Sequence, residues 1–446
     1  MFKRNVLSEL EKWKNSDTRK PLLMRGARQV GKTTVVEQFG KSFNNYLYFN
    51  LEREEHRRLF ETQIPTDMLV EQLFWNCRTE RKPGTTLIFI DEIQNSPKTI
   101  ALLRYFYEDR PDLYVIAAGS LLESIVDVQF SFPVGRVQYM PMRPCSFCEF
   151  VEALGEGRLL AVAADPRLVS VVHNQLLALF NRYVIIGGMP QAVQQYAANR
   201  DVMAIDDIYE TLLQAYRDDV EKYVRGNKLI GTVRFVVENG WRFAGSTIAM
   251  NGFAGSTYRS REINEAFNLL EKAMLLELVY PATNTEVPIL PENKRRPKLI
   301  WLDTGLVNYA AGIRSEIIGC NDILDVWRGR IAEHIVAQEL LTLNHRISQR
   351  RAFWTKGTGG ESAEVDFVWV VDSQIIPIEV KSGHNSHLRS LHAFVDSSST
   401  HVAVRIWSGE FSVDDLTTTI KKKPFKLINL PFYLIWNMEN IVKQYL

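Results

Sequence analysis

The stretch RGARQVGKTT, residues 25–34, matches the phosphate-binding pattern G-x-x-x-x-G-K-[ST] without a mismatch. A short apolar strand is expected before it, at residues 22–24, and a helix after it, from about Thr33. The glycines let the backbone turn its N–H groups toward phosphate oxygens, and the helix adds the positive end of its dipole. The sequence therefore predicts an ATP site. Its contacts are expected from nine consecutive residues: Gly26, Ala27, Arg28, Gln29, Val30, Gly31, Lys32, Thr33 and Thr34.

Side chains at the end of this loop and at the end of a later strand supply the expected chemistry. Lys32 is expected to reach the β- and γ-phosphates, and Thr33 to offer its hydroxyl to Mg²⁺. The apolar run TLIFIDE, residues 86–92, ends in two acids. We expect Asp91 to hold Mg²⁺, directly or through water, and Glu92 to polarise the attacking water. Two adjacent acids at this place favour hydrolysis over binding alone.

Two further polar residues are candidates for contact with the γ-phosphate. Ser120 follows the next apolar strand, in AAGS, where a hydroxyl can contact the phosphate or orient the water. Arg136, in the stretch PVGR, is expected to sense the γ-phosphate in its own subunit or from a neighbouring one. A purely structural role for either residue stays open.

The order of expected elements indicates several parts. Up to about residue 150, short apolar strands alternate with helices, which indicates a parallel sheet covered on both faces. After Pro144 the pattern is mainly helical and is interrupted by GGMPQ, residues 187–191. From about residue 325 the alternation of helix and strand returns. The fold class is therefore α/β with a helical insertion.

Residues 245–282 have the pattern of a winged helix-turn-helix. Ser256 and Thr257 are expected to cap a long helix over residues 260–277, and a strand-like LELVYPA overlaps its end. Exposed arginine and asparagine side chains on such a helix can read base edges in the major groove. A rigid lid or a protein contact is the alternative. The candidate contact residues are Tyr258, Arg259, Arg261 and Asn264.

A second set of charged residues lies near the C-terminus. EVDFV, residues 364–368, and IPIEVKSG, residues 376–383, are expected to pair as a hairpin around a turn near Asp372. Glu379 and Lys381 are two residues apart and share one strand face, and the hairpin can bring Asp366 beside them. Two acids for a divalent metal and a lysine are the set that metal-assisted phosphodiester cleavage needs. A binding module with ordinary surface charges is the alternative.

RGARQVGKTT, LIFIDEIQ, AAGSLLESI and RPCSFCEF follow one another as in a family of bacterial and archaeal AAA+-like ATPases, which the chain resembles over most of its length. The resemblance, which extends to STAND-type archaeal ATPases, implies a polar sensor at Ser120. The family pattern P-x-S-F-x-E-F implies that Cys145 and Cys148, a lone CxxC, are incidental. GGMPQ resembles a lid element that places Gly188 and Pro190 near the adenine. Family members carry a C-terminal domain of unknown function.

The C-terminal set resembles the PD-(D/E)XK restriction-endonuclease-like nucleases. Glu333, in GRIAEH, matches an additional helix acid that many of them use for metal. The resemblance implies an α-β-β-β-α-β core with metal at Glu333, Asp366 and Glu379. The full expectation is an AAA+-like P-loop core at residues 1–150, a helical lid at 151–239, a winged helix at 240–310 and a nuclease-like domain at 311–446.

Composition and charge limit the classes of protein. The chain has 446 residues, 53 basic and 52 acidic side chains and a net charge of +1, which is less basic than a dedicated nucleic-acid coat protein. Basic runs at residues 294–296, 350–351 and 421–423 are expected to be solvated loops. No secretion signal or membrane span is expected, and four cysteines fit a reducing cytoplasm.

These expectations combine into an ATP-dependent switch with Mg²⁺ as its metal. Its output is expected to be action of the C-terminal domain on DNA or RNA. The alternative is a switch whose C-terminal domain binds a protein partner without cleaving nucleic acid. The sequence leaves the oligomeric state open, and the partners it allows are a second copy of the chain, on which Arg136 could act, or another protein.

Overall fold

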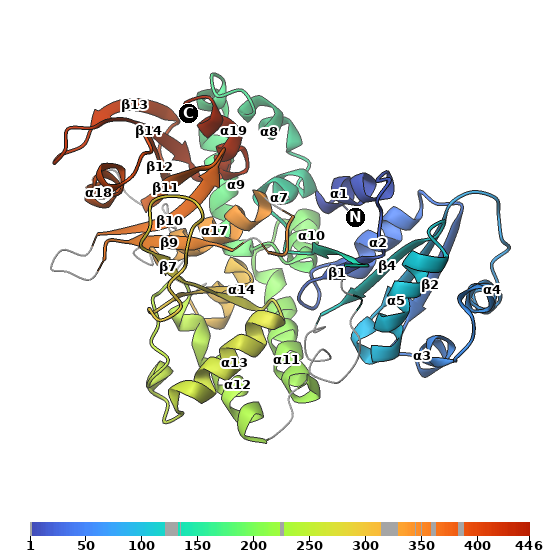
Figure 1. The fold of residues 1–446 in the computed structure, drawn as a ribbon. Helices are drawn as coiled ribbons and strands as arrows, with labels where there is room; N and C mark the ends of the chain where they lie inside the picture. The colour runs from blue at the N-terminus through green and yellow to red at the C-terminus, as the bar shows by residue number, and fades with distance from the viewer. Residues whose placement is uncertain are drawn as a thin grey trace.

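The computed structural model describes residues 2–120, 133, 135–223, 227–313, 329–343, 345–348, 350–357, 363–381 and 388–446. Figure 1 shows an N-terminal α/β part beside a larger part that combines helices with a second sheet. None of the described helices is long and apolar enough to cross a bilayer.

The N-terminal sheet has five strands in the order β2-β3-β4-β1-β5, and every pairing is parallel. Parallel strands buried on both faces were expected from the apolar runs, so this prediction is confirmed. Successive residues of β1 face opposite ways, because Leu22 and Leu23 belong to different apolar cores. The strands are β1 (Leu22–Arg25), β2 (Asn45–Asn50), β3 (Thr86–Asp91), β4 (Tyr114–Gly119) and β5 (Gln138–Pro141).

Helices cover both faces of this sheet. Helices α1 and α2 contribute Leu10 and Val36 to one core, and α3, α4 and α5 contribute Phe60, Leu73 and Leu103 to the other. The helices are α1 (Val6–Lys14), α2 (Lys32–Gly40), α3 (Glu54–Glu61), α4 (Thr66–Asn76) and α5 (Pro97–Asp109), with a 3-10 turn η1 (Ile93–Asn95). The P-loop leaves the carboxyl end of β1 and enters α2, which was the expected context.

A helical region follows β5. Its first helix begins with a reciprocal cap, in which the Ser146 hydroxyl accepts from Glu149 N and Glu149 accepts from Ser146 N. This cap gives a physical reason for the stretch PCSFCEF. The elements are α7 (Phe147–Ala153), α8 (Gly157–Ala163), α9 (Val169–Ile186), α10 (Pro190–Asn199), η2 (Met203–Ile205), α11 (Asp206–Tyr223), α12 (Asn227–Asn239), η3 (Gly240–Phe243) and η4 (Phe253–Gly255).

The next segment contains α13 (Ser260–Lys272) and two antiparallel strands, β6 (Leu276–Val279) and β8 (Lys298–Trp301), followed by α14 (Thr304–Ala310). The expected helix over residues 260–277 was too long, because the backbone turns at Met274 with a φ of 59° and then enters β6. The expected cap at Ser256 and Thr257 was also wrong. Arg259 occupies the cap position, and its N–H donates to Glu262 Oε2 at 3.1 Å.

The second sheet has seven strands in the order β13-β14-β12-β11-β10-β9-β7. Strands β10 and β11 form the expected hairpin, and its turn places Asp372 and Ser373 at φ values of 43° and 65°. The elements are β7 (Pro281–Ala282), α17 (Arg330–Leu340), η5 (Leu341–Leu343), β9 (Ala352–Thr355), β10 (Glu364–Val371), β11 (Gln374–Lys381), α18 (Arg389–Ser397), β12 (Val402–Trp407), β13 (Ser412–Thr417), β14 (Pro424–Pro431), η6 (Phe432–Asn437) and α19 (Met438–Lys443).

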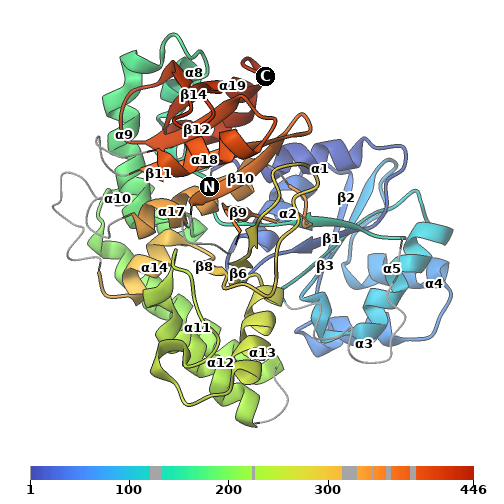
Figure 2. The same cartoon turned by 60° about the vertical axis from the view of Figure 1, so that its left-hand side comes forward.

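Helix α17 connects this sheet to the helical region, and the turned view in Figure 2 shows it close to α14 and beneath the sheet. Its Glu339 is fully buried and accepts from Phe147 N at 3.2 Å and from the Tyr183 hydroxyl at 2.7 Å. Burial raises the pKa of Glu339 to about 7. The folded chain therefore holds a carboxyl group that prefers its protonated form.

We expect this group to make stability fall as pH rises. Glu339 has an unfolded pKa of about 4.3, so between about pH 4 and pH 7 the folded state binds more protons than the unfolded state. Its contribution is present at low pH and is lost as pH rises through the folded pKa, by up to about 3 kcal/mol. Glu339→Gln should therefore flatten the pH dependence of the unfolding free energy, measured by urea titration. An unchanged slope in Glu339→Gln would contradict this origin.

Candidate functional site

The P-loop lies at the carboxyl edge of the parallel sheet, with Asp91 and Ser120 at the ends of neighbouring strands. Gly31 has a φ of 94°, a left-handed conformation that favours glycine. A Cβ atom at Gly31 would lie 3.6 Å from Pro190 Cγ, so the first residue of α10 contacts the phosphate-binding turn. Pro190 therefore lies beside the phosphate-binding turn, and its expected place near the adenine stays a prediction. Gly188 instead packs against the Cys145 backbone.

Lys32 is buried and folds back on the loop. Its Nζ donates to Gly26 O and to Ala27 O, each at 2.9 Å. Burial lowers the pKa of Lys32, and the nearby Glu92 and Asp91 carboxylates oppose this shift. A phosphate group offers the ammonium a stronger, charged acceptor than these carbonyls. The lysine is therefore poised to exchange two neutral acceptors for a phosphate.

Thr33 and Asp91 meet beneath the loop. The Thr33 hydroxyl donates to Asp91 Oδ2 at 2.7 Å, and the Tyr48 hydroxyl lies 3.4 Å from the same oxygen. Asp91 is buried, and desolvation raises its pKa, while the Thr33 hydrogen bond opposes the rise. A hydroxyl and a buried carboxylate side by side are oxygen ligands of the kind that Mg²⁺ prefers. Thr33 and Asp91 therefore fit the metal expected with ATP.

Glu92 and Ser120 complete the edge of the sheet. Glu92 adopts a left-handed backbone with φ 53° and ψ 43°, and its carboxylate accepts from Gln94 Nε2. Such a conformation is uncommon for a residue with a side chain and turns Glu92 out of the strand direction. The Ser120 hydroxyl is buried without a hydrogen-bond partner in the described part of the chain. A buried hydroxyl without a partner is open to a ligand atom.

The helical region contacts the P-loop through Arg28. The Arg28 side chain pairs with Asp219 of α11 and lies 4.0 Å from Glu52. The Tyr216 hydroxyl, also on α11, donates to Arg28 O at 3.2 Å. On the other side, Arg4 donates to Val30 O at 3.1 Å. These contacts would therefore transmit movement of the loop to α11 when a nucleotide binds.

Arg136 lies at the wrong edge of the sheet for this site in its own subunit. Strand β5 runs parallel to β1 with Gln138 opposite Leu22, so Arg136 precedes the amino-terminal edge. The P-loop leaves the opposite, carboxyl-terminal edge. Arg136 instead pairs with Glu108 of α5. Sensing of γ-phosphate in the same subunit does not fit this arrangement, and action from a neighbouring subunit stays a prediction.

A second cluster of charged side chains lies between β8, α17 and β10. Its central residue, Lys298, was not predicted from the sequence. Lys298 of β8 is buried, and its Nζ lies 2.9 Å from Glu333 Oε2, 2.9 Å from Glu364 Oε1 and 3.6 Å from Asp366 Oδ1. These carboxylates raise the pKa of Lys298 against the effect of burial. Nothing in the sequence around Lys298 marks it, since it begins an otherwise apolar strand.

The remaining two expected residues lie next to this cluster. Glu379 is buried and pairs with Lys381 Nζ through Oε1 at 2.6 Å, while its Oε2 has no hydrogen-bond partner among the described residues. Asp366 Oδ2 accepts from Val380 N at 2.8 Å. Burial and the neighbouring Asp366 raise the pKa of Glu379 to about 7. Across the described ranges, no three Asp, Glu, His or Cys side chains are arranged as ligands of one metal ion.

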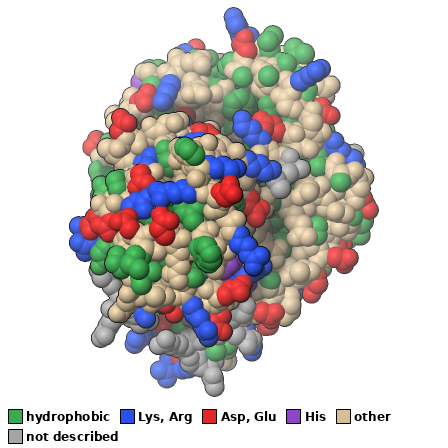
Figure 3. Space-filling view, turned by 90° about the vertical axis from the view of Figure 1, so that its right-hand side faces the viewer, with side chains coloured by type: hydrophobic (Ala, Val, Ile, Leu, Met, Phe, Trp, Pro, Cys, Tyr) green, Lys and Arg blue, Asp and Glu red, His purple; other side chains and the backbone are tan. Residues whose placement is uncertain are grey.

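The candidate contact residues of the predicted winged helix have less specific surroundings than the residues of the two charged clusters. Arg259, Arg261 and Asn264 are exposed on α13, whereas Tyr258 packs on Phe235. Figure 3, which views the face at the right of Figure 1, shows basic and acidic side chains intermingled there.

The basic runs are not all solvated loops. Arg351 is buried and pairs with Glu277 at 2.7 Å. Lys423 donates to the carbonyl groups of Val395, Ser398 and Thr400. These two charges therefore stabilise the fold, contrary to expectation.

The cysteines of the CxxC stretch are free thiols. Burial raises the pKa of Cys145 and of Cys148, so the thiolate form that reacts or binds metal is disfavoured. This agrees with the interpretation that the two cysteines are incidental.

Comparison with known families places the P-loop residues in a recognised domain. Residues 18–151 match the family described as AAA domain. Residues 177–317 and 328–422 match two families described as domains of unknown function, DUF8612 and DUF4143. The AAA-like P-loop part of the expected fold is thereby confirmed. The winged helix and the nuclease-like domain stay predictions.

Individual relatives are distant. The uncharacterized protein MJ1637 of Methanocaldococcus jannaschii is 23% identical over 366 residues, which cover 75% of this chain and 71% of that protein. The Walker-type ATPase PABY2304 of Pyrococcus abyssi is 15% identical with a TM-score of 0.41, covering 70% of this chain and 96% of that one. The Aeropyrum pernix ORC1 protein in complex with DNA is 12% identical with a TM-score of 0.27, covering 70% and 90%. TM-scores this low do not establish a shared fold.

Proposed function

Because residues 18–151 form an AAA-like P-loop domain, we propose that the chain binds ATP with Mg²⁺ and hydrolyses the γ-phosphate bond. The observation that carries this proposal is the Thr33–Asp91 contact of 2.7 Å beneath the Lys32 ammonium. This contact supports the proposal because two candidate metal ligands and a candidate phosphate counter-charge lie close together. Mg²⁺ held by Thr33 and Asp91 would neutralise negative charge on the phosphates of ATP. Release of phosphate by the wild-type chain, lost in Lys32→Ala, tests the proposal.

The lid contacts support a switch in which the nucleotide controls the position of α11. Binding of phosphate would draw Lys32 off the Gly26 and Ala27 carbonyls. The loop that then rearranges carries Arg28, which Asp219 and Tyr216 of α11 hold. A change at the γ-phosphate therefore reaches a helix outside the nucleotide domain. Such coupling is common in γ-phosphate switches.

For the C-terminal part, the order α17-β9-β10-β11-α18-β12 supports a nuclease-like fold that acts on nucleic acid. Asp366 and Glu379 fit two ligands of a divalent metal, since Glu379 Oε2 is a buried oxygen to which no described residue donates a hydrogen bond. The metal would activate the attacking water and polarise the phosphodiester oxygen. Lys381, paired with Glu379, would stabilise charge on the phosphate. The segment α12-α13-β6-β8 is consistent with the winged helix, in which the exposed Arg261 and Asn264 would contact DNA.

One observation favours the second candidate, a switch that binds a protein partner. Lys298 already supplies one positive charge to the Glu333, Glu364 and Asp366 carboxylates in the described structure. A lysine there offsets the repulsion that a metal would otherwise relieve. In this alternative the acid cluster is a structural ion-pair network, and the sheet presents a surface to another protein.

Divalent metal distinguishes the two candidates. We expect Mn²⁺ to raise the melting temperature of the Lys32→Ala protein without nucleotide, because binding to the folded state alone stabilises it. Asp366→Ala in the same background should abolish this rise. Asp372→Asn, at the exposed hairpin turn, is the matched control and should keep it. Absence of a Mn²⁺ effect in Lys32→Ala would favour the partner-binding switch.

Arg136 tests whether a neighbouring subunit completes the ATP site. Mixing Arg136→Ala with Glu92→Gln should restore part of the phosphate release, because a mixed interface would combine an intact Glu92 with an intact Arg136. The mixture is compared with each variant alone at equal total concentration. No recovery would assign Arg136 to its ion pair with Glu108.

A further inference from the structure

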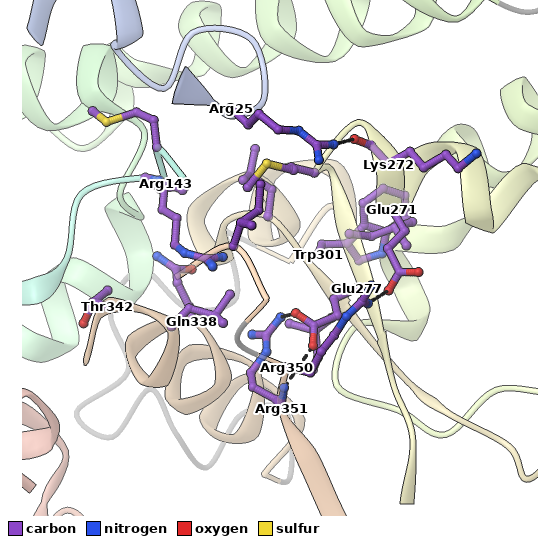
Figure 4. Close-up of a pocket in the computed structure, with 18 of the residues that line it drawn as sticks. Arg25, Arg143, Glu271, Lys272, Glu277, Trp301, Gln338, Thr342, Arg350 and Arg351 are labelled. Carbon is purple, nitrogen blue, oxygen red and sulfur yellow. Dashed lines mark hydrogen bonds and ion pairs between the residues drawn. The ribbon is translucent and has the colours of Figure 1, made fainter. Parts of the chain in front are cut away.

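A cavity of about 500 Å³ lies where the nucleotide domain, the α13–β8 segment and the C-terminal part meet. Its lining includes Arg25 and Arg143 from the nucleotide domain, Lys272 from α13, and Arg350 and Arg351 from the segment before β9. Figure 4 shows Arg143 reaching into this space from one side and Arg350 and Arg351 lying across it. Cavities of roughly 300 to 1,000 Å³ accommodate small-molecule ligands.

Most of the charges that line the cavity have partners on the protein. Arg350 pairs with Glu271 at 2.8 Å, and Arg351 pairs with Glu277 at 2.7 Å. Arg25 donates to the Lys272 carbonyl at 3.2 Å. The positive charges outnumber the acids of the lining, because Arg25, Arg143 and Lys272 add to two balanced pairs.

Arg143 differs from Arg25, Arg350 and Arg351, the arginines of the lining that have partners. Its Nε is buried and has no hydrogen-bond partner, and no ion pair joins its guanidinium to another side chain in the described part of the molecule. Burial and the neighbouring Arg351 lower the pKa of Arg143 to about 10, so it stays charged at neutral pH. The Arg143 side chain is partly exposed, but a charge largely withdrawn from water without an ion-pair partner is costly, which is why such charges are normally paired. A ligand with negative charge would remove this cost.

Part of the lining is apolar, beside polar residues such as Asn268, Gln338 and Thr342. Met142, Leu276, Ile300, Trp301 and Leu341 contribute to it. Such a wall suits an uncharged ring system, whereas the Arg143 end suits a phosphate group. A free inorganic ion would leave the apolar wall without a partner.

We propose that this cavity binds a small organic anion of the size of a nucleoside monophosphate, with its phosphate on Arg143 and its ring system on the apolar wall. The site is separate from the P-loop, whose phosphate ligand is Lys32. It adjoins the P-loop through Arg25, the residue before Gly26, and it adjoins the second sheet through Arg351. A ligand here would contact three parts of the chain at once.

Calorimetry on the full-length Lys32→Ala protein tests the site without the P-loop contribution. The probes are adenosine and guanosine 5′-monophosphates, adenosine, inorganic phosphate and a short duplex DNA. We expect at least one nucleotide to bind, with adenosine and inorganic phosphate about tenfold or more weaker, because each lacks one half of the contacts. Failure of both nucleotides to bind would overturn the proposal, as would equal binding of inorganic phosphate. Binding of duplex DNA instead of a nucleotide would also overturn it.

The Arg143 variants separate a ligand contact from a structural role. Arg143→Met should weaken nucleotide binding about tenfold or more and raise the melting temperature of the free protein, since it removes an unpaired buried charge. Arg143→Lys should keep part of the binding. Arg167→Met, an exposed arginine paired with Asp165, is the matched control and should change neither. Nucleotide binding that is unchanged in Arg143→Met would overturn the assignment, and so would a lowered melting temperature of the free protein.

Discussion

Glu92→Gln should release phosphate from ATP about 10²- to 10⁴-fold more slowly than the wild-type chain while still binding ATP. Glutamine keeps the size of the side chain and its contact with Gln94, but it cannot accept the proton or polarise the attacking water as a carboxylate does. The loss should therefore appear in turnover and not in nucleotide affinity. Phosphate release under saturating ATP measures the first quantity, and calorimetry measures the second.

Glu55→Gln, an exposed glutamate on α3, is the matched control and should keep wild-type turnover. Equal turnover in wild type and Glu92→Gln would overturn the role of Glu92. The Mg²⁺ ligands would then remain in place, and another group would have to orient the water.

Lys298→Met should lower the free energy of unfolding by about 3 to 5 kcal/mol, the range seen when one partner of a buried charge cluster is removed. Methionine fills a similar volume, but it leaves Glu333 and Asp366 close together without a counter-charge. Urea unfolding without metal measures the loss. Lys294→Met, an exposed lysine four residues earlier, should have little effect.

The Lys298→Met variant also tests whether the Lys298 ammonium keeps a divalent metal ion away from the carboxylates. With the ammonium gone, Mn²⁺ should stabilise Lys298→Met more than it stabilises the wild-type chain, because the uncompensated carboxylates attract the ion. A Lys298→Met protein as stable as wild type would contradict the view that this lysine holds the acids together. Destabilisation without any response to Mn²⁺ would favour the partner-binding switch.

The nucleotide domain could be predicted largely from the sequence, because its signals are local. The P-loop pattern fixes a turn between a strand and a helix, and LIFI, residues 87–90, is apolar throughout because β3 is buried on both faces. Strand β5 was not predicted, since Gln138 and Tyr139 are exposed and only its last two residues are buried. Short edge strands lack the apolar pattern on which such predictions depend.

The second cluster could be predicted only in part, because its residues come from distant segments. Asp366, Glu379 and Lys381 lie on one hairpin, so strand periodicity places them together. Lys298 reaches them from β8, and no local pattern reports a contact between segments so far apart. The edge at which Arg136 lies follows likewise from the pairing of β5 with β1, which the sequence does not show.

Binding of ATP at the P-loop is tested most directly by calorimetric titration of ATP with Mg²⁺ into the wild-type and Lys32→Ala chains. The Lys32 ammonium lies within the loop that Gly26, Ala27 and Gly31 form, beside the Thr33–Asp91 pair. We expect ATP to bind the wild-type chain stoichiometrically. The affinity of Lys32→Ala for ATP should be about 100-fold lower, since a buried phosphate would lose its counter-charge. Equal affinity of the two proteins for ATP would contradict it.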